Sequence, residues 1–98
     1  MSEPLISFEP ATGEELWRGP VSNIDHEVEI ARSAWPEWAS KPVTFRTETL
    51  RRFVDRVKAE AEPFADLIAR ETGKPLWEAR TEVESVANKV DISVKAYA

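Results

Sequence analysis

A short break at Gly73–Lys74–Pro75 constrains the fold of this chain more than any other feature of its sequence. Gly73 suits the left-handed conformation that commonly ends a helix, and Pro75 prevents the same helix from continuing. Proline is also favoured at the first position of a new helix. Since apolar residues at helical spacing lie on both sides, the break predicts two helices, over 63–72 and 75–97, joined by a tight turn.

The helix expected after the break is long and amphipathic. Its apolar residues recur in steps of three and four, which places them along one face. They are Leu76, Ala79, Val83, Val86, Val90, Val94 and Tyr97. The other face is charged, so the apolar face is the first surface on which we expect contacts.

Two earlier helices are predicted, over 24–38 and 43–61. Ser22 and Asn23 are both good N-caps for the first of them. Pro36 lacks a backbone donor, so we expect the regular helix to end near residue 35 and a short turn to continue to Trp38. The apolar stripe of the first helix is Ile24, Val28, Ala31, Trp35 and Trp38, and that of the second is Leu50, Phe53, Val54, Val57 and Ala61. The solvated side of the second helix is assigned to Arg46, Arg51, Arg52, Arg56, Lys58 and Glu60.

The N-terminal residues predict a small β-hairpin, 5–9 with 15–19. Pro10 and Gly13 between the two runs supply turn chemistry. A hairpin alone is only marginally stable, so it must lie on the helices or join a larger sheet. The predicted fold is therefore mainly α, of the α+β class: a short N-terminal hairpin followed by about four helices in one segment, 1–98.

Composition narrows the class of protein. The 98 residues fit one globular unit, and the net charge of −5 argues against binding to a nucleic-acid backbone. No apolar run approaches the ~20 residues that span a bilayer, so we expect no membrane partner. The absence of cysteine removes disulfides and a thiol nucleophile. With no signal peptide visible at Met1–Pro4, the expected compartment is the cytoplasm.

No catalytic or cofactor-binding residue can be assigned. Glu78 and Glu82 lie one helical turn apart and, with Glu84, could act as acid and base or hold a hard cation. Their spacing fits a solvated face beside Arg80 better. The only histidine, His26, falls in an acidic first turn and is expected at the surface. The four tryptophans suit packing rather than a cofactor platform.

Several short motifs, taken together and in order, resemble the N-terminal part of aldehyde dehydrogenases. Glu9–Glu14 resembles the Asn-Pro-Ala-Thr-Gly-Glu turn of that family, with glutamate in the first position. The Val28–Trp35 helix, Arg46 with Leu50, and Ala69–Pro75 follow in family order at similar distances.

Within the family, two longer runs resemble the succinylglutamic semialdehyde dehydrogenases of arginine catabolism. These runs are Ile68–Ala79 and Asn88–Tyr97. The distance from Pro75 to Tyr97, about one helical turn longer than in many members of the family, also fits this subgroup.

The resemblance implies a parent enzyme several times longer than this chain, which would oxidise an aldehyde to a carboxylate with NAD or NADP. A cysteine thiolate would attack the aldehyde, hydride would pass to the nicotinamide, and a glutamate-activated water would release the acid. The catalytic residues and most of the nucleotide-binding region are expected beyond Ala98. The N-terminal fragment alone is therefore expected to be inactive and to bind no cofactor.

The resemblance also implies partners and a metal site. The partners are the rest of the parent enzyme and further copies in a homo-oligomer. Some relatives hold a structural Na⁺ or K⁺ with two backbone carbonyls before the Pro-Ala-Thr-Gly turn and one carboxylate after Gly-Lys-Pro. Those positions are Ser7, Phe8 and Glu82 here, and a hard cation would need additional oxygens from the parent.

A second interpretation uses the residues alone: a free-standing acidic helical module that binds another protein through its last helix. Under the enzyme interpretation, the faces covered in the parent are exposed in this chain. These are Trp17, Trp35, Trp38 and the apolar stripe of the last helix. Exposed patches of this kind favour association between copies.

Overall fold

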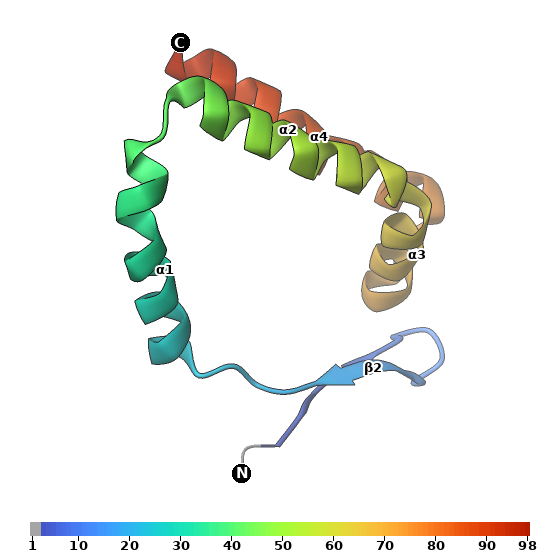
Figure 1. Ribbon diagram of the computed structural model, residues 1–98. Coiled ribbons are helices and arrows are strands. Elements are labelled where there is room, and N and C mark those ends of the chain that lie inside the picture. Colours follow the sequence, from blue (N-terminus) through green and yellow to red (C-terminus); the bar gives the residue numbers. More distant parts are fainter. Residues whose placement is uncertain (1–2) are drawn as a thin grey trace.

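A computed structural model describes residues 3–98 as two strands followed by four helices (Figure 1). The prediction of a mainly α chain with an N-terminal hairpin and four helices is confirmed. The elements are β1 (Leu5–Phe8), β2 (Glu15–Gly19), α1 (Ile24–Ser40), α2 (Val43–Ala59), α3 (Ala61–Thr72) and α4 (Leu76–Tyr97).

The hairpin has the predicted strands and turn. β1 and β2 pair antiparallel with Ser7 opposite Trp17, and the register shifts directly after Ser7. The turn is closed by two backbone hydrogen bonds of 2.8 Å, one from the Glu9 N–H to the Glu14 carbonyl and one from the Gly13 N–H to the Glu9 carbonyl. Gly13 takes a φ of +77°, which glycine adopts without steric cost.

The first helix begins where expected and continues further than expected. Asn23 caps α1, because its side-chain oxygen accepts from the His26 N–H at 3.1 Å. The prediction that Pro36 ends the regular helix is wrong, since α1 runs through it to Ser40. Proline removes one donor, so the Arg32 carbonyl lacks its usual partner. α1 buries no residue, and water can therefore bond this carbonyl.

The α3–α4 joint confirms the role predicted for its glycine. Gly73 has a φ of +77° and its N–H donates to the Ala69 carbonyl at 2.9 Å. Pro75 is the N-cap of α4 rather than its first helical residue. α3 begins at Ala61, two residues before the expected start at Pro63. A proline is tolerated there because first-turn N–H groups have no acceptor within the helix.

The core of the described residues is small and lies where α2, α3 and α4 meet. Its side chains are short, which lets the helices approach closely. The buried residues are Val57, Ala65, Ala79, Val83 and Ala87. The expectation that the α4 stripe would be exposed is therefore wrong for Ala79 and Val83. On α2, Leu50 and Phe53 belong to the predicted stripe but remain exposed, so the core covers only the C-terminal half of that helix.

The described chain is open rather than compact. Its radius of gyration is 17.1 Å, whereas a compact domain of this length has about 13 Å. In Figure 1, α1 stands apart from the α2–α4 pair, and the hairpin lies below α3. Trp17, Trp35 and Trp38 are exposed, as predicted. None of the helices in residues 3–98 combines the length and the apolar composition needed to cross a bilayer.

Candidate functional site

Polar contacts attach the hairpin to the end of α3. The Glu71 carboxylate accepts from the Ser7 hydroxyl and from Trp17 Nε1, the latter at 3.3 Å. Arg70 Nε donates to Glu9 Oε2 at 2.7 Å. Because Arg70 and Glu71 are adjacent at the helix end, one short segment fixes both strands and the turn of the hairpin.

The charges at this attachment suit a structural contact better than acid–base chemistry. The Arg70 guanidinium, which donates to Glu9, holds the pKa of that carboxyl below its ordinary value, and the Thr12 side chain acts in the same direction. The same contact raises the pKa of Arg70. A general acid or base at neutral pH needs a pKa moved toward 7, which is the opposite direction for Glu9.

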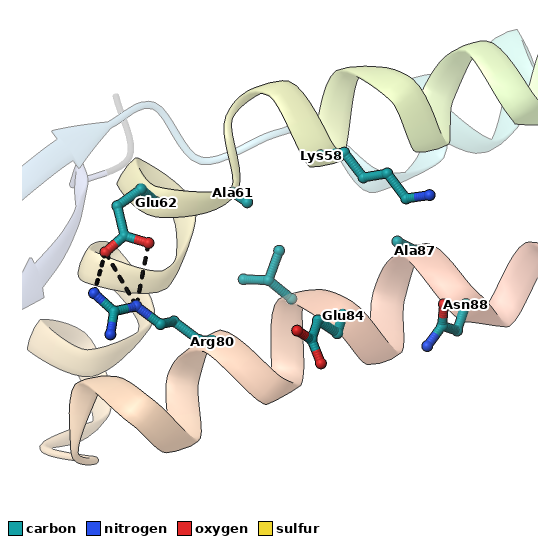
Figure 2. Close-up of a pocket in the computed structure, with 8 residues that line it drawn as sticks. Lys58, Ala61, Glu62, Arg80, Glu84, Ala87 and Asn88 are labelled. Carbon is teal, nitrogen blue, oxygen red and sulfur yellow. Dashed lines mark hydrogen bonds and ion pairs between the residues drawn. The ribbon is translucent and has the colours of Figure 1, made fainter.

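A groove of about 310 Å³ lies between α4 and the α2–α3 corner (Figure 2). Lys58, Glu62, Arg80, Glu84 and Asn88 supply its polar lining. Figure 2 shows Glu62 on α3 facing Arg80 on α4, and Arg80 Nε donates to Glu62 Oε1 at 3.1 Å. This contact lowers the pKa of Glu62 and raises that of Arg80. The pair therefore joins α3 to α4, and both shifts favour the charged forms of its two members.

Lys74, which lies between α3 and α4, is the partner of Glu82 on α4. The sequence had suggested Arg80 for this role. Glu82 forms an ion pair with Lys74, whose pKa is raised first by this hydrogen bond and further by the charge of Glu78. Arg80 instead pairs with Glu62 across the groove. Lys74 thus pairs directly with Glu82, and Glu78 acts on it only through its charge.

One predicted cation ligand already has a partner in this arrangement. The Glu82 carboxylate accepts from the Lys74 ammonium, whereas Ser7 and Phe8 were expected to contribute backbone carbonyls rather than side chains. A Na⁺ or K⁺ ion on Glu82 would therefore have to compete with the Lys74 ammonium. No group of three His, Cys, Asp or Glu side chains within residues 3–98 could hold a metal ion. The site at Ser7, Phe8 and Glu82 stays a prediction.

The remaining candidates are not brought together. His26 lies exposed in the first turn of α1, while the α4 glutamates lie on another element. The three glycines, Gly13, Gly19 and Gly73, fall in separate joints. A dinucleotide site needs a glycine-rich turn between a parallel strand and a helix, whereas β1 and β2 form a hairpin. Residues 3–98 therefore contain no glycine-rich turn between a parallel strand and a helix.

Arg46 also differs from its predicted environment. It was assigned to the solvated side of α2, but it is half-buried and lines a groove between α2 and α4. Its Nε atom is buried and has no hydrogen-bond partner among the described residues. The signal was present, since Arg46 precedes Leu50 by four residues and so lies on the apolar stripe.

Comparison with known proteins gives a consistent result. A model described as "Aldehyde dehydrogenase family" matches residues 2–98. The chain is 88% identical over 98 residues to the N-succinylglutamate 5-semialdehyde dehydrogenase of Sphingopyxis alaskensis, which covers 100% of this chain. It is 56% identical over 94 residues to the protein of that name in Novosphingobium aromaticivorans, covering 96% of this chain. It is also similar to N-succinylglutamate 5-semialdehyde dehydrogenase 2 of Caulobacter vibrioides, at 44% identity over 96 residues and 95% of this chain. The chain spans 20% of the length of each of these relatives.

Proposed function

The chain belongs to the aldehyde dehydrogenase family, and we propose that it is the N-terminal structural part of an NAD(P)-dependent enzyme that oxidises a semialdehyde to a carboxylate. The proposed substrate of the whole enzyme is N-succinylglutamate 5-semialdehyde. The observation that carries this proposal is the 88% identity, over the entire chain, to a relative named for that substrate. We propose the cytoplasm as its compartment and a homo-oligomer as its assembled state.

The contribution of these 98 residues to that enzyme is structural. Several of their charged groups form ion pairs that join elements, such as Glu9 with Arg70 and Glu62 with Arg80. Their large apolar side chains, including Ile24 and Trp35, are mostly exposed. Such faces favour coverage by other parts of a protein. This exposure supports the enzyme proposal over a free-standing module.

A kinetic experiment tests the proposed activity. The full-length protein is purified and assayed for formation of reduced nicotinamide with NAD⁺ and with NADP⁺. N-succinylglutamate 5-semialdehyde is compared with glutamate 5-semialdehyde, which lacks the succinyl group. We expect kcat/KM to be at least about tenfold higher for the succinylated substrate, because enzymes discriminate by transition-state binding and a tenfold ratio needs only ~1.4 kcal/mol. Equal values would contradict the proposed substrate.

The 98-residue chain serves as the second arm of that experiment. We expect no turnover with either nucleotide, because residues 3–98 present neither a thiol nucleophile nor a dinucleotide-binding turn. Measurable nicotinamide reduction by this chain would overturn its structural role.

The monovalent cation at Ser7, Phe8 and Glu82 is a separate proposal. It is tested by the melting temperature of the full-length protein in NaCl, KCl and choline chloride at equal ionic strength. Stabilisation by Na⁺ or K⁺ that disappears in Glu82→Gln supports the site. Equal melting temperatures in all three salts would show that Lys74 suffices as the counter-charge of Glu82.

A further inference from the structure

A second groove lies at the other end of the α2–α4 pair. In Figure 1 the first turns of α2 run beside the last turns of α4, near the C-terminal label. The groove has a volume of about 470 Å³. Its walls come from both helices: Val43, Thr47 and Leu50 from α2, and Ser93, Val94 and Tyr97 from α4. These side chains are mainly apolar. Arg46 has the one charged side chain among the residues that line the groove, and Ala98, the last residue of the sequence, also borders it.

The guanidinium of Arg46 is incompletely satisfied in this groove. Its Nε atom is buried from solvent and has no acceptor within the described part of the chain. Leaving a buried donor unpaired destabilises the folded state, and more so when the donor belongs to a charged group. In native proteins the large majority of buried side-chain polar atoms have a hydrogen-bond partner, so the unpaired Nε atom of Arg46 calls for an acceptor.

We infer that this groove docks a segment from the remainder of the same polypeptide. That segment presents a carboxylate to Arg46 and apolar side chains to Leu50, Val94 and Tyr97. A carboxylate is the acceptor that complements an arginine best, in charge and in geometry. The inference rests on the proposed function in one respect, namely that the chain is part of a longer protein.

Two considerations favour a segment of the same polypeptide as the occupant of the groove: the length of chain outside the described residues and the effect of covalent linkage. The chain spans 20% of the length of its relatives, so four fifths of such a protein lies outside the described residues. A covalently linked segment acts at a high effective concentration, without the cost of associating two molecules. A second copy of the chain is the competing occupant.

Thermal stability of the full-length protein tests the contact. Arg46→Met keeps a long side chain and removes the charge. Arg52→Met is the matched control, because Arg52 lies on the exposed side of α2. We expect Arg46→Met to shorten the half-life of the folded protein at a fixed temperature by roughly tenfold more than Arg52→Met, since it strands a buried carboxylate. Circular dichroism at that temperature measures the loss of folded protein with time. An equal effect of the two variants would overturn the inference.

Photo-crosslinking of the full-length protein identifies the occupant. Benzoylphenylalanine replaces Leu50 inside the groove and, as control, Arg52 outside it. We expect an intramolecular cross-link from position 50 alone, to a peptide that contains Asp or Glu. Cross-links between subunits would overturn the choice of occupant in favour of a second copy. A large Arg46→Met effect with no cross-link at position 50 would overturn the inference that a segment docks in the groove.

Both readouts are independent of catalysis, so the two proposals can fail separately. An active dehydrogenase with an open groove would refute the docking inference alone. An intramolecular cross-link in a protein that does not oxidise N-succinylglutamate 5-semialdehyde would refute the substrate alone.

Discussion

Gly73 has a backbone conformation that other residues adopt only at a cost in free energy. Its φ of +77° lies in the left-handed region, and an added Cβ would meet no atom within 4 Å. The cost of substitution is therefore backbone strain rather than a clash. We expect Gly73→Ala to lower the free energy of unfolding by about 1–2 kcal/mol, as measured by urea denaturation of the full-length protein.

Two variants check the physical reason for this effect. Gly73→Asn should cost less than Gly73→Ala, because asparagine tolerates the left-handed region better. Gly19→Ala should change stability little, since Gly19 does not have a positive φ and the added Cβ makes only an ordinary contact of 3.9 Å with Trp17. A Gly19→Ala loss equal to that of Gly73→Ala would remove the left-handed conformation as the explanation.

The hairpin is the element whose placement depends most on single side chains. Glu71 accepts from both strands, through Ser7 and Trp17. We expect Glu71→Ala to speed amide exchange in β1 and β2 by about fivefold, the factor that corresponds to ~1 kcal/mol for a lost polar contact. Hydrogen exchange measured by mass spectrometry reports this directly. Glu48→Ala, on the exposed side of α2, is the control and should leave the hairpin unchanged.

The hairpin attachment should also weaken in acid. The pKa of Glu9 in the folded chain lies below its ordinary value of 4.5, because Arg70 stabilises the carboxylate. A carboxyl with a lowered folded pKa contributes stability that is fully present above the unfolded pKa and is lost as the pH falls through the folded value. We therefore expect hairpin exchange, corrected for its intrinsic pH dependence, to be constant above about pH 4.5 and to accelerate below it.

Arg70→Met separates this contact from other acidic groups. In that variant the pKa of Glu9 returns toward its ordinary value, so the extra loss of protection below pH 4.5 should shrink. Arg18→Met is the matched control, since Arg18 pairs with Glu15 on the same strand and does not link the hairpin to α3. The attribution to Glu9 is refuted if both variants flatten the acid response equally.

At the scale of the whole molecule, the described chain exposes surfaces that an isolated protein would bury. α1 has no buried residue, and its Ile24 and Trp35 side chains are 75% and 66% exposed. We expect the isolated 98-residue chain to self-associate as its concentration rises, because exposed apolar faces drive association. Analytical ultracentrifugation measures this. Ile24→Gln combined with Trp35→Gln should reduce association, and His26→Gln on the same helix should not.

Local interactions made several features of this protein predictable from the sequence. The Asn23 cap, the left-handed Gly73 and the hairpin turn at Gly13 depend on residues within about four positions of one another, so their signals are contained in short windows. The family could be recognised in the same way, from short motifs in order. Pro36 is the exception among local signals, because its cost depends on whether solvent reaches the helix around it.

Only the tertiary structure decided which faces are covered. Periodicity places Leu50, Val57 and Arg46 on one stripe of α2, but it does not tell which of them another helix reaches. The packing buries Val57, leaves Leu50 exposed and encloses the Nε atom of Arg46. Glu71 likewise acquires its partners across 64 residues. The sequence by itself determined which elements form and those ends that neighbouring residues specify, such as the start of α1 at Asn23 and the end of α3 at Gly73. Burial and ion pairing follow from which elements meet in space, and that depends on the whole chain.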